Sequence, residues 1–352
     1  MFMICENDLI NKISDDELFR QTKPGLFFTH DSIGFIDVGA RGGILELFDP
    51  IKSITSVIAF EPDTDECNNI IAADDADKFH SKTVISKALS DSVGVASLFR
   101  YSMSTNDSLL REEPCFVERY SISTLSCIGK TQVETTTIDT LMYGELNSSQ
   151  LKADIIKLDV QGTEFEILQG AKRTIGEQTT CIIAEVSFFP AYKGQKLFSD
   201  IELFLRDFGF SFYGFLDLHY RSCRLIEKSA HNGRERLRWA DAVFIKDPLD
   251  PKINNKRDVS DRQLYIIFIF SLLTGYFDYA LELAQKTWSK DQEVVLIKEL
   301  IGKLSFLDPL ITVEEVKKLL VNVEQSPENA NIIVGKFVDK RRSIQDYDDC
   351  TL

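Results

Sequence analysis

The sequence predicts an α/β protein with a Rossmann-like domain, in which a mostly parallel sheet carries helices on both faces, followed by a small all-α segment. Two observations lead to this class. Short apolar runs alternate with helical stretches between about residues 34 and 246, which is typical of a parallel sheet. After a polar, proline-bearing stretch at 247–258, the hydrophobic spacing becomes helical throughout.

Five apolar runs are the expected main strands, and they lie at 35–38, 57–60, 83–85, 155–158 and 181–184. Helices are expected at 164–173 and 199–207, and further strands at about 211–216 and 242–245 could close the sheet edge. The stretch from 92 to 137 is rich in Ser and Thr and lacks a helical period, so we expect loops and short strands inserted before the fourth main strand. Long insertions of this kind are often functional.

The expected domain organisation has three parts. Residues 1–31 are predicted to form an amphipathic helix that Pro24 and Gly25 break, and then a linker. Residues 32–247 form the Rossmann-like domain. Residues 258–345 form either a separate helical module or a helical cap that packs on the sheet, with a helical hairpin at 264–285 and helices at about 291–305 and 313–323.

Charge and cysteine content exclude several classes of partner. The 352-residue chain has a formal net charge of −15, which disfavours nucleic acid and anionic membrane surfaces as partners. The seven cysteines form no C-x-x-C pair, which favours free thiols in a reducing cytoplasm. The N-terminus lacks the basic region of a signal peptide, and the longest strongly apolar run, 264–273, is too short to span a bilayer.

Three motifs at strand ends carry the functional interpretation. A glycine-containing loop, DVGARGG at 37–43, follows the first strand, and Glu61 ends the second strand about 20 residues later. An acid at that place accepts hydrogen bonds from ribose hydroxyls in nucleotide-binding Rossmann folds. Asp159 ends the fourth strand and precedes a glycine turn. Ligands of open parallel sheets bind outside the carboxyl ends of the strands, so the three motifs predict a nucleoside-containing cofactor.

Seven segments, in order, resemble the FkbM family of methyltransferases over about residues 34–246. They are FIDVGARGG, VIAFEPDTDECNNI, KALSD at 87–91, TTIDTL at 136–141, DIIKLDVQGTEFEILQGA, IIAEVSFFPAYKGQKLFSDIELFLRDFGF and RWADAVFIKD.

The resemblance implies S-adenosyl-L-methionine as the cofactor and O-methylation of a sugar, glycan or secondary-metabolite hydroxyl as the activity. It places Glu61 on the ribose, the 39–43 loop against the methionine portion, and residues near Lys87, Ala88 and Leu89 along the adenine. The cofactor-binding residues are then expected to be the following: Asp37, Gly39, Arg41, Gly43, Glu61, Pro62, Ala88 and Asp159.

Two positions depart from the family pattern. Arg41 stands where the family usually has Asn, and it could pair with the cofactor carboxylate or project into solvent. Gln161 stands where the family usually has Glu, which removes a negative charge beside Asp159 and would weaken any divalent-metal site. We therefore expect no metal.

Methyl transfer to oxygen needs alignment of the reacting atoms and a base for the hydroxyl proton. The candidate catalytic residues are Asp159, Glu185 and His219, with Glu164 and Tyr192 as further candidate bases. A nicotinamide dehydrogenase is a weaker interpretation because the G-x-G-x-x-G spacing is absent. A non-catalytic adaptor in a glycan-assembly complex, with a vestigial cofactor site and a protein partner on the C-terminal helices, is the main alternative.

Overall fold

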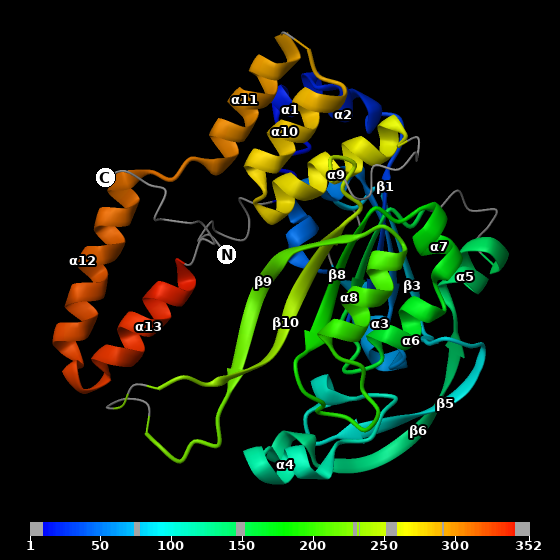
Figure 1. Cartoon of the computed structure of the whole chain (residues 1–352), viewed down its shortest axis with the longest axis vertical. Helices are drawn as coiled ribbons and strands as arrows, with labels where there is room; N and C mark the ends of the chain where they lie inside the picture. Colours follow the sequence, from blue (N-terminus) through cyan, green and yellow to red (C-terminus); the bar gives the residue numbers. More distant parts are fainter. Residues whose placement is uncertain are drawn as a thin grey trace.

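The structure is a computed structural model that describes residues 10–73, 78–145, 152–227, 231, 233–250, 259–290 and 292–341. Its centre is a seven-stranded sheet in the order β3-β2-β1-β7-β8-β10-β9 (Figure 1). The strands are β1 (Ile33–Val38), β2 (Thr55–Phe60), β3 (Ser81–Ile85), β7 (Ile155–Leu158), β8 (Cys181–Ser187), β9 (Ser211–Arg221) and β10 (Arg236–Ile245). The first five are parallel, and β10 pairs antiparallel with both β8 and β9. The predicted α/β class and its mostly parallel sheet are confirmed.

Both faces of the sheet are covered by helices because the central strands are apolar on both sides. Alternate residues of β1 belong to different cores, with Phe35 in one and Ile36 in the other. The Ile36 core includes residues of α6 (Glu164–Gln169), α7 (Lys172–Glu177) and α8 (Phe198–Asp207). The Phe35 core includes residues of α1 (Glu17–Gln21), α9 (Asp261–Thr274), α10 (Phe277–Thr287) and α11 (Gln292–Ser305).

The Ser- and Thr-rich insertion forms a small structure of its own beside the carboxyl ends of the main strands. A three-stranded sheet in the order β4-β6-β5 consists of β4 (Ala88–Leu89), β5 (Gly94–Tyr101) and β6 (Cys127–Thr136). The short helix α4 (Pro114–Tyr120) lies between β5 and β6 in sequence. Phe116 and Tyr120 of this helix pack with Phe189 and Tyr192 of the loop after β8, so the insertion is joined to the main domain by an aromatic cluster.

Near the N-terminus, the prediction that Pro24 and Gly25 break the helix is wrong. They lie inside α2 (Lys23–Phe27), where Pro24 takes a first-turn position that needs no N–H group. The side chain of Thr22 accepts from Gly25 N and caps this helix. The part of the predicted amphipathic helix that includes Leu9 lies outside the described residues.

Helix α9 is buried on all sides and closes one face of the sheet. Ser260 and Gln263 form a capping box at its start, and Gly275, with φ +82°, ends it. Nine residues of the helix, Leu264–Leu272, are buried, as expected of a helix without a polar face.

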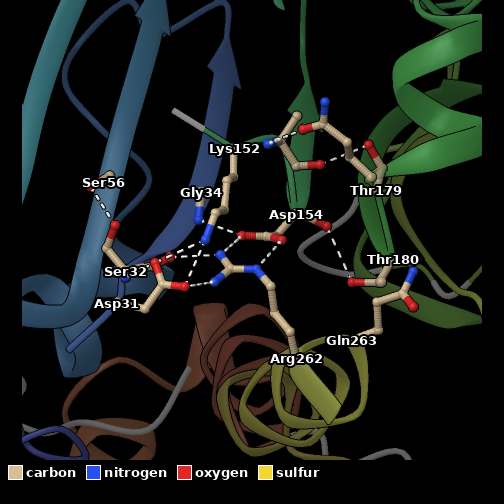
Figure 2. A network of polar contacts seen from close by, with 12 residues as sticks. Asp31, Ser32, Gly34, Ser56, Lys152, Asp154, Thr179, Thr180, Arg262 and Gln263 are labelled. Carbon is tan, nitrogen blue, oxygen red and sulfur yellow. Dashed lines mark hydrogen bonds and ion pairs between the residues drawn. The ribbon is translucent and has the colours of Figure 1, made fainter. Parts of the chain in front are cut away.

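An ionic network fastens α9 to the amino-terminal edge of the sheet (Figure 2). Arg262 Nη1 lies 2.6 Å from Asp31 Oδ2, and its Nη2 lies 2.5 Å from Asp154 Oδ2. The backbone N–H of Gly34 donates to the same Asp154 oxygen at 2.7 Å, and Lys152 pairs with Asp31 at 2.6 Å. The network joins the C-terminal helices to β1 and β7, on the side of the sheet opposite to the strand ends that carry the motifs.

The last two helices, α12 (Pro309–Gln325) and α13 (Ala330–Lys340), differ from the three before them. Neither has a buried residue, and they lie apart from the sheet in Figure 1. Helix α13 was not predicted. A boundary near residues 247–258 stays a prediction, and of this stretch only 247–250 belongs to the described residues. The shared core of α9–α11 and the sheet favours the helical-cap alternative for that part of the C-terminal segment.

Candidate active site

A cavity of about 190 Å³ lies where β1, β2 and β7 end. This is the edge at which open parallel sheets bind ligands. Among the predicted site residues, its lining includes Gly39, Arg41, Glu61, Pro62, Ala88 and Asp159. The insertion supplies another part of the wall, with Leu98, Ser104, Thr105, Asp107, Ser108 and Leu109. Sequence reasoning missed these insertion residues individually, and the only signal was the length and composition of the insertion.

The turn after β1 requires glycine at position 39. Gly39 has φ +79°, and a Cβ there would lie 1.8 Å from the backbone oxygen of Asp159. Gly39 N and Ala40 N both donate to Phe60 O, at 3.0 and 3.1 Å, which holds the turn against the end of β2. Glycine at position 39 therefore lets the turn pack closely against the end of β7 at the edge of the cavity.

Asp37 and Gly43, which the sequence also assigned to the cofactor, are not part of the cavity lining. Asp37 is fully buried, and its Oδ2 accepts from Leu45 N at 3.0 Å, while Lys157 Nζ lies 3.4 Å from Oδ1. Asp37 thus holds the backbone of the loop in place without bordering the cavity.

Glu61 ends β2 with its carboxylate directed at the loop. Its Oε1 accepts from Asp63 N at 2.9 Å and from Arg41 Nη2 at 3.3 Å. Its Oε2 has no hydrogen-bond partner in the described part of the chain, and the side chain is only 4% exposed. Burial raises the pKa of Glu61, although Asp63 N–H and Arg41 act in the opposite direction.

Arg41 does not project into solvent, and its pairing with the cofactor carboxylate stays a prediction. Its Nη2 lies 3.3 Å from Glu61, 3.4 Å from Asp63 and 3.8 Å from Asp107, and the side chain is largely buried. Arg100 of β5, which the sequence did not single out, pairs with Asp63 at 2.8 Å and with Asp107 at 3.1 Å. Two arginines and three carboxylates therefore join the insertion to the mouth of the cavity.

Gln161 connects the cavity to the second group of acids. Its Nε2 donates to Asp159 Oδ1 at 3.2 Å and lies 3.5 Å from both oxygens of Glu185. Its Oε1 accepts from Tyr192 OH at 3.2 Å, and its backbone oxygen accepts from Ser108 Oγ at 2.7 Å. The amide thus stands between two carboxylates, and its left-handed backbone, φ +60°, is a strained conformation for a residue other than glycine.

Two buried acids near Gln161, Glu185 and Glu164, hold protons more tightly than free carboxyl groups. Burial, followed by the charges of Asp159, Glu164 and Asp241, raises the pKa of Glu185 well above its ordinary value. Burial also raises the pKa of Glu164 to about 7. Although burial of Lys157 has the opposite effect, Asp37 and Asp159 hold the pKa of this ammonium above its ordinary value, so Lys157 remains charged.

The three candidate catalytic residues do not come together. Asp159 lines the cavity, and Glu185 is reached from it through Gln161. His219 lies two strands from β8, because it pairs with Trp239 of β10, which in turn pairs with Ser187. Its ring stacks on Trp239 at 3.4 Å between centroids, and desolvation lowers the pKa of His219.

The described residues offer neither a metal-binding cluster nor a membrane-spanning helix. They contain no group of three or more His, Cys, Asp or Glu side chains arranged to hold a metal ion. None of the helices that the structure describes has the length and apolar character to span a bilayer.

Comparison with known proteins assigns the family. The profile of the Methyltransferase FkbM domain matches residues 37–212, which is half of the chain and contains the glycine loop, Glu61, Asp159 and Glu185. The chain belongs to the FkbM methyltransferase family. The resemblance drawn from the seven segments is thereby confirmed, and membership of a methyltransferase family supports S-adenosylmethionine as the cofactor.

The solved structures that match this FkbM chain share low sequence identity and low TM-scores with it. The FkbM methyltransferase from Methylobacillus flagellatus KT is 14% identical, with a TM-score of 0.35, over 61% of this chain and 44% of that one. Magnesium protoporphyrin IX methyltransferase (ChlM) from Synechocystis PCC 6803, solved with bound SAM, is 11% identical, with a TM-score of 0.28, over 63% and 76% of the two chains. TrmK from M. capricolum, solved with S-adenosyl-homocysteine, is 11% identical, with a TM-score of 0.29, over 80% and 94%. This chain thus spans less than half the length of the first of these proteins, and no curated protein sequence matches it.

Proposed function

We propose that this FkbM-family protein transfers a methyl group from S-adenosylmethionine to a hydroxyl oxygen of a sugar, glycan or secondary metabolite. The observation that carries the proposal is the Glu61 carboxylate at the cavity edge. One of its oxygens is held by Asp63 N–H and Arg41, and Oε2 has no hydrogen-bond partner among the described residues. A carboxylate oxygen with free lone pairs suits the hydroxyls of an unphosphorylated ribose.

The remaining cavity residues fit the same cofactor. Gly39 is part of the cavity wall, and Pro62 and Ala88 offer apolar surface on the side where an adenine ring would lie. Asp159 stands at the other end, beside Gln161, where the transferable methyl group would be. Asp37 acts indirectly by holding the loop, and Gly43 gives the loop its backbone conformation with φ +121°.

S-adenosylmethionine, when bound, supplies a methyl group on a positively charged sulfur. The chain has to orient the acceptor hydroxyl and remove its proton while the oxygen–carbon bond forms. We assign the proton to Glu185, because a raised pKa makes its carboxylate a stronger base and Gln161 links it to Asp159 at the cavity. His219 is a weaker candidate since it stacks on Trp239 away from Gln161.

The reaction is proposed to need no metal. The amide of Gln161 donates toward Asp159 and Glu185 from the place between them. A divalent cation that bridged these two carboxylates would have to displace that amide, and hard cations prefer a charged oxygen at such a place.

Incubation of the protein with S-adenosylmethionine labelled on the methyl group, together with fractionated cell glycans and small molecules, tests the activity. We expect label in a hydroxyl-bearing fraction. Glu185→Gln should lower the rate about 10²- to 10⁴-fold while it leaves cofactor affinity unchanged. Binding of the cofactor without transfer to any fraction would contradict the enzymatic proposal and favour the non-catalytic adaptor.

A protein partner is proposed for the exposed hairpin of α12 and α13. Neither helix has a buried residue, yet several large apolar side chains are exposed on them, among them Leu310, Ile311, Leu320, Val321 and Val338. Such a surface is typical of a protein-contact site. If the hairpin serves only contacts, a chain that ends before it should bind S-adenosylmethionine as the full chain does.

A further inference from the structure

Three arginines gather where β9 and β10 run past the rest of the sheet, on the side where α4 lies (Figure 1). Arg221 and Arg236 are directly opposite each other in the antiparallel ladder. Arg238 follows on β10, where the negative charge of Glu185 and the positive charge of Arg221 both act on it. The cluster is unusual because the chain as a whole has a net charge of −15.

None of these three arginines forms an ion pair with a carboxylate in the described residues, whereas Arg41, Arg100 and Arg262 all do. Like charges directly opposite each other on neighbouring strands destabilise a sheet. In addition, Arg221 Nε is buried and has no acceptor within the part of the chain that the structure describes. A buried donor without an acceptor costs stability, and an anion bound between these arginines would offset both costs.

The arginine cluster lies against the aromatic cluster that joins the insertion to the main domain. The guanidinium of Arg236 lies 4.0 Å from the centre of the Phe189 ring, and that of Arg238 lies 5.4 Å from the Phe116 ring. Both rings belong to the aromatic cluster that contains Tyr192, whose hydroxyl donates to Gln161. The charge of Arg238 also acts on Glu185, so an acceptor held beside Gln161 and Glu185 would have the arginine cluster close to it.

We propose that Arg221, Arg236 and Arg238 bind an anionic group, phosphate or carboxylate, on the molecule that receives the methyl group. The inference rests on the proposed function and narrows its acceptor from any sugar or metabolite to an acidic one. Guanidinium groups match the oxygens of both anions with paired hydrogen bonds, and the aromatic rings hold two of the arginines in position. The overall negative charge of the chain disfavours extended polyanions, so the ligand is a small molecule with a local charge.

The alternative is that the three arginines only cover the aromatic rings, and a matched control variant distinguishes this structural role from anion binding. Arg119 of α4 stacks on Tyr120 of the same aromatic cluster at 5.4 Å and lies outside the trio. Arg119→Gln should therefore disturb ring packing about as much as a change in the trio, but it should not affect an anion.

The test uses the full chain at low ionic strength and two probes, pyrophosphate and glucuronate, in separate calorimetric titrations. The wild-type protein should bind at least one probe, and which one binds distinguishes phosphate from carboxylate. The double variant Arg221→Gln/Arg236→Gln should lose at least about tenfold in that affinity, as expected when charge-assisted hydrogen bonds are removed. Arg119→Gln should bind like the wild type, and all proteins should keep the same affinity for S-adenosylmethionine.

Equal probe affinity in the wild type and the double variant would overturn the anion site, as would failure of the wild type to bind either probe. If the double variant unfolds, Arg221→Lys/Arg236→Lys is titrated in its place, because it keeps the positive charge but not the paired hydrogen bonds. A weaker affinity for the probe than in the wild type then supports the anion site, and an equal affinity overturns it. The link to the acceptor is tested by the labelled product of the methyl-transfer assay, which should be retained on an anion exchanger at pH 7, whereas a neutral product overturns it. Failure of the proposed function itself would show separately, as absent binding of S-adenosylmethionine.

Discussion

Glu61→Gln is the substitution that tests the cofactor site most directly. Glutamine has nearly the shape of glutamate, and its amide oxygen can keep the hydrogen bond from Asp63 N–H that Oε1 now accepts at 2.9 Å. The amide nitrogen then takes the place of Oε2, where it can donate a hydrogen bond but cannot accept one. The loop should stay folded, since Arg41 also pairs with Asp63.

The expected loss follows from the bonds removed. Hydrogen bonds from ribose hydroxyls to a charged acceptor contribute about 1.5–3 kcal/mol, and a buried carboxylate belongs in that range. We therefore expect Glu61→Gln to weaken S-adenosylmethionine binding about 10- to 150-fold at 25 °C. Glu61→Ala should be at least as damaging, because it also leaves Asp63 N–H without its acceptor.

Isothermal titration calorimetry with S-adenosylmethionine and S-adenosylhomocysteine measures both affinities. Asp65→Asn, an exposed acid in the helix that follows Glu61, is the matched control and should bind like the wild type. Thermal unfolding of each variant shows whether the fold is retained. A folded Glu61→Gln protein with wild-type affinity would refute the assignment of Glu61 to the ribose.

Four further outcomes are expected. Activity should survive a strong chelator, and its loss with recovery on addition of magnesium would contradict metal independence. A chain that ends at Leu307 should keep the cofactor affinity and thermal stability of the full chain. A chain that ends at Asp247 loses the helices that cover one face of the sheet and should aggregate. If the chain that ends at Asp247 is instead soluble and binds the cofactor, the C-terminal helices form a separate module. Arg262→Ala should lower the free energy of unfolding by about 3–5 kcal/mol, because it leaves the buried Asp154 without its counter-charge, whereas loss of the exposed pair in Arg206→Ala should have much less effect; similar losses in the two would mean that the network is not stabilising. Burial raises the pKa of Glu164 to about 7, so the contribution of its protonated form to stability is fully present below the pKa of the unfolded state and is lost as the pH rises through about 7. In Glu164→Gln, chemical denaturation at several pH values should therefore show a smaller decline in the free energy of unfolding between pH 5 and 7 than in the wild type. An identical decline in the two proteins would contradict the raised pKa.

The sequence by itself determined the sheet and the position of the site on it. Phe35–Val38 is apolar except at Asp37, and Val57–Phe60 is apolar throughout. Such runs are stable only when both faces are buried, which predicts parallel strands between helices. Glycine at 39 and acids at 61 and 159 follow strand ends, and parallel strands bring their carboxyl ends to one edge. The family resemblance followed from the same local segments.

Only the tertiary structure decided what fills the space around those motifs. Arg41 pairs with Glu61 and Asp63 because the insertion brings Asp107 and Arg100 to the cavity mouth, and no local pattern specifies that contact. Gln161 stands between Asp159 and Glu185 because β7 and β8 are neighbours, although 24 residues separate Gln161 from Glu185 in the chain. The opposed Arg221 and Arg236 depend on the register of β9 and β10, which local sequence specifies poorly when the two strands are joined by a long loop. The sequence thus predicted which residues end the strands at the site, whereas the partners of the charged side chains depend on contacts between segments that are far apart in the chain.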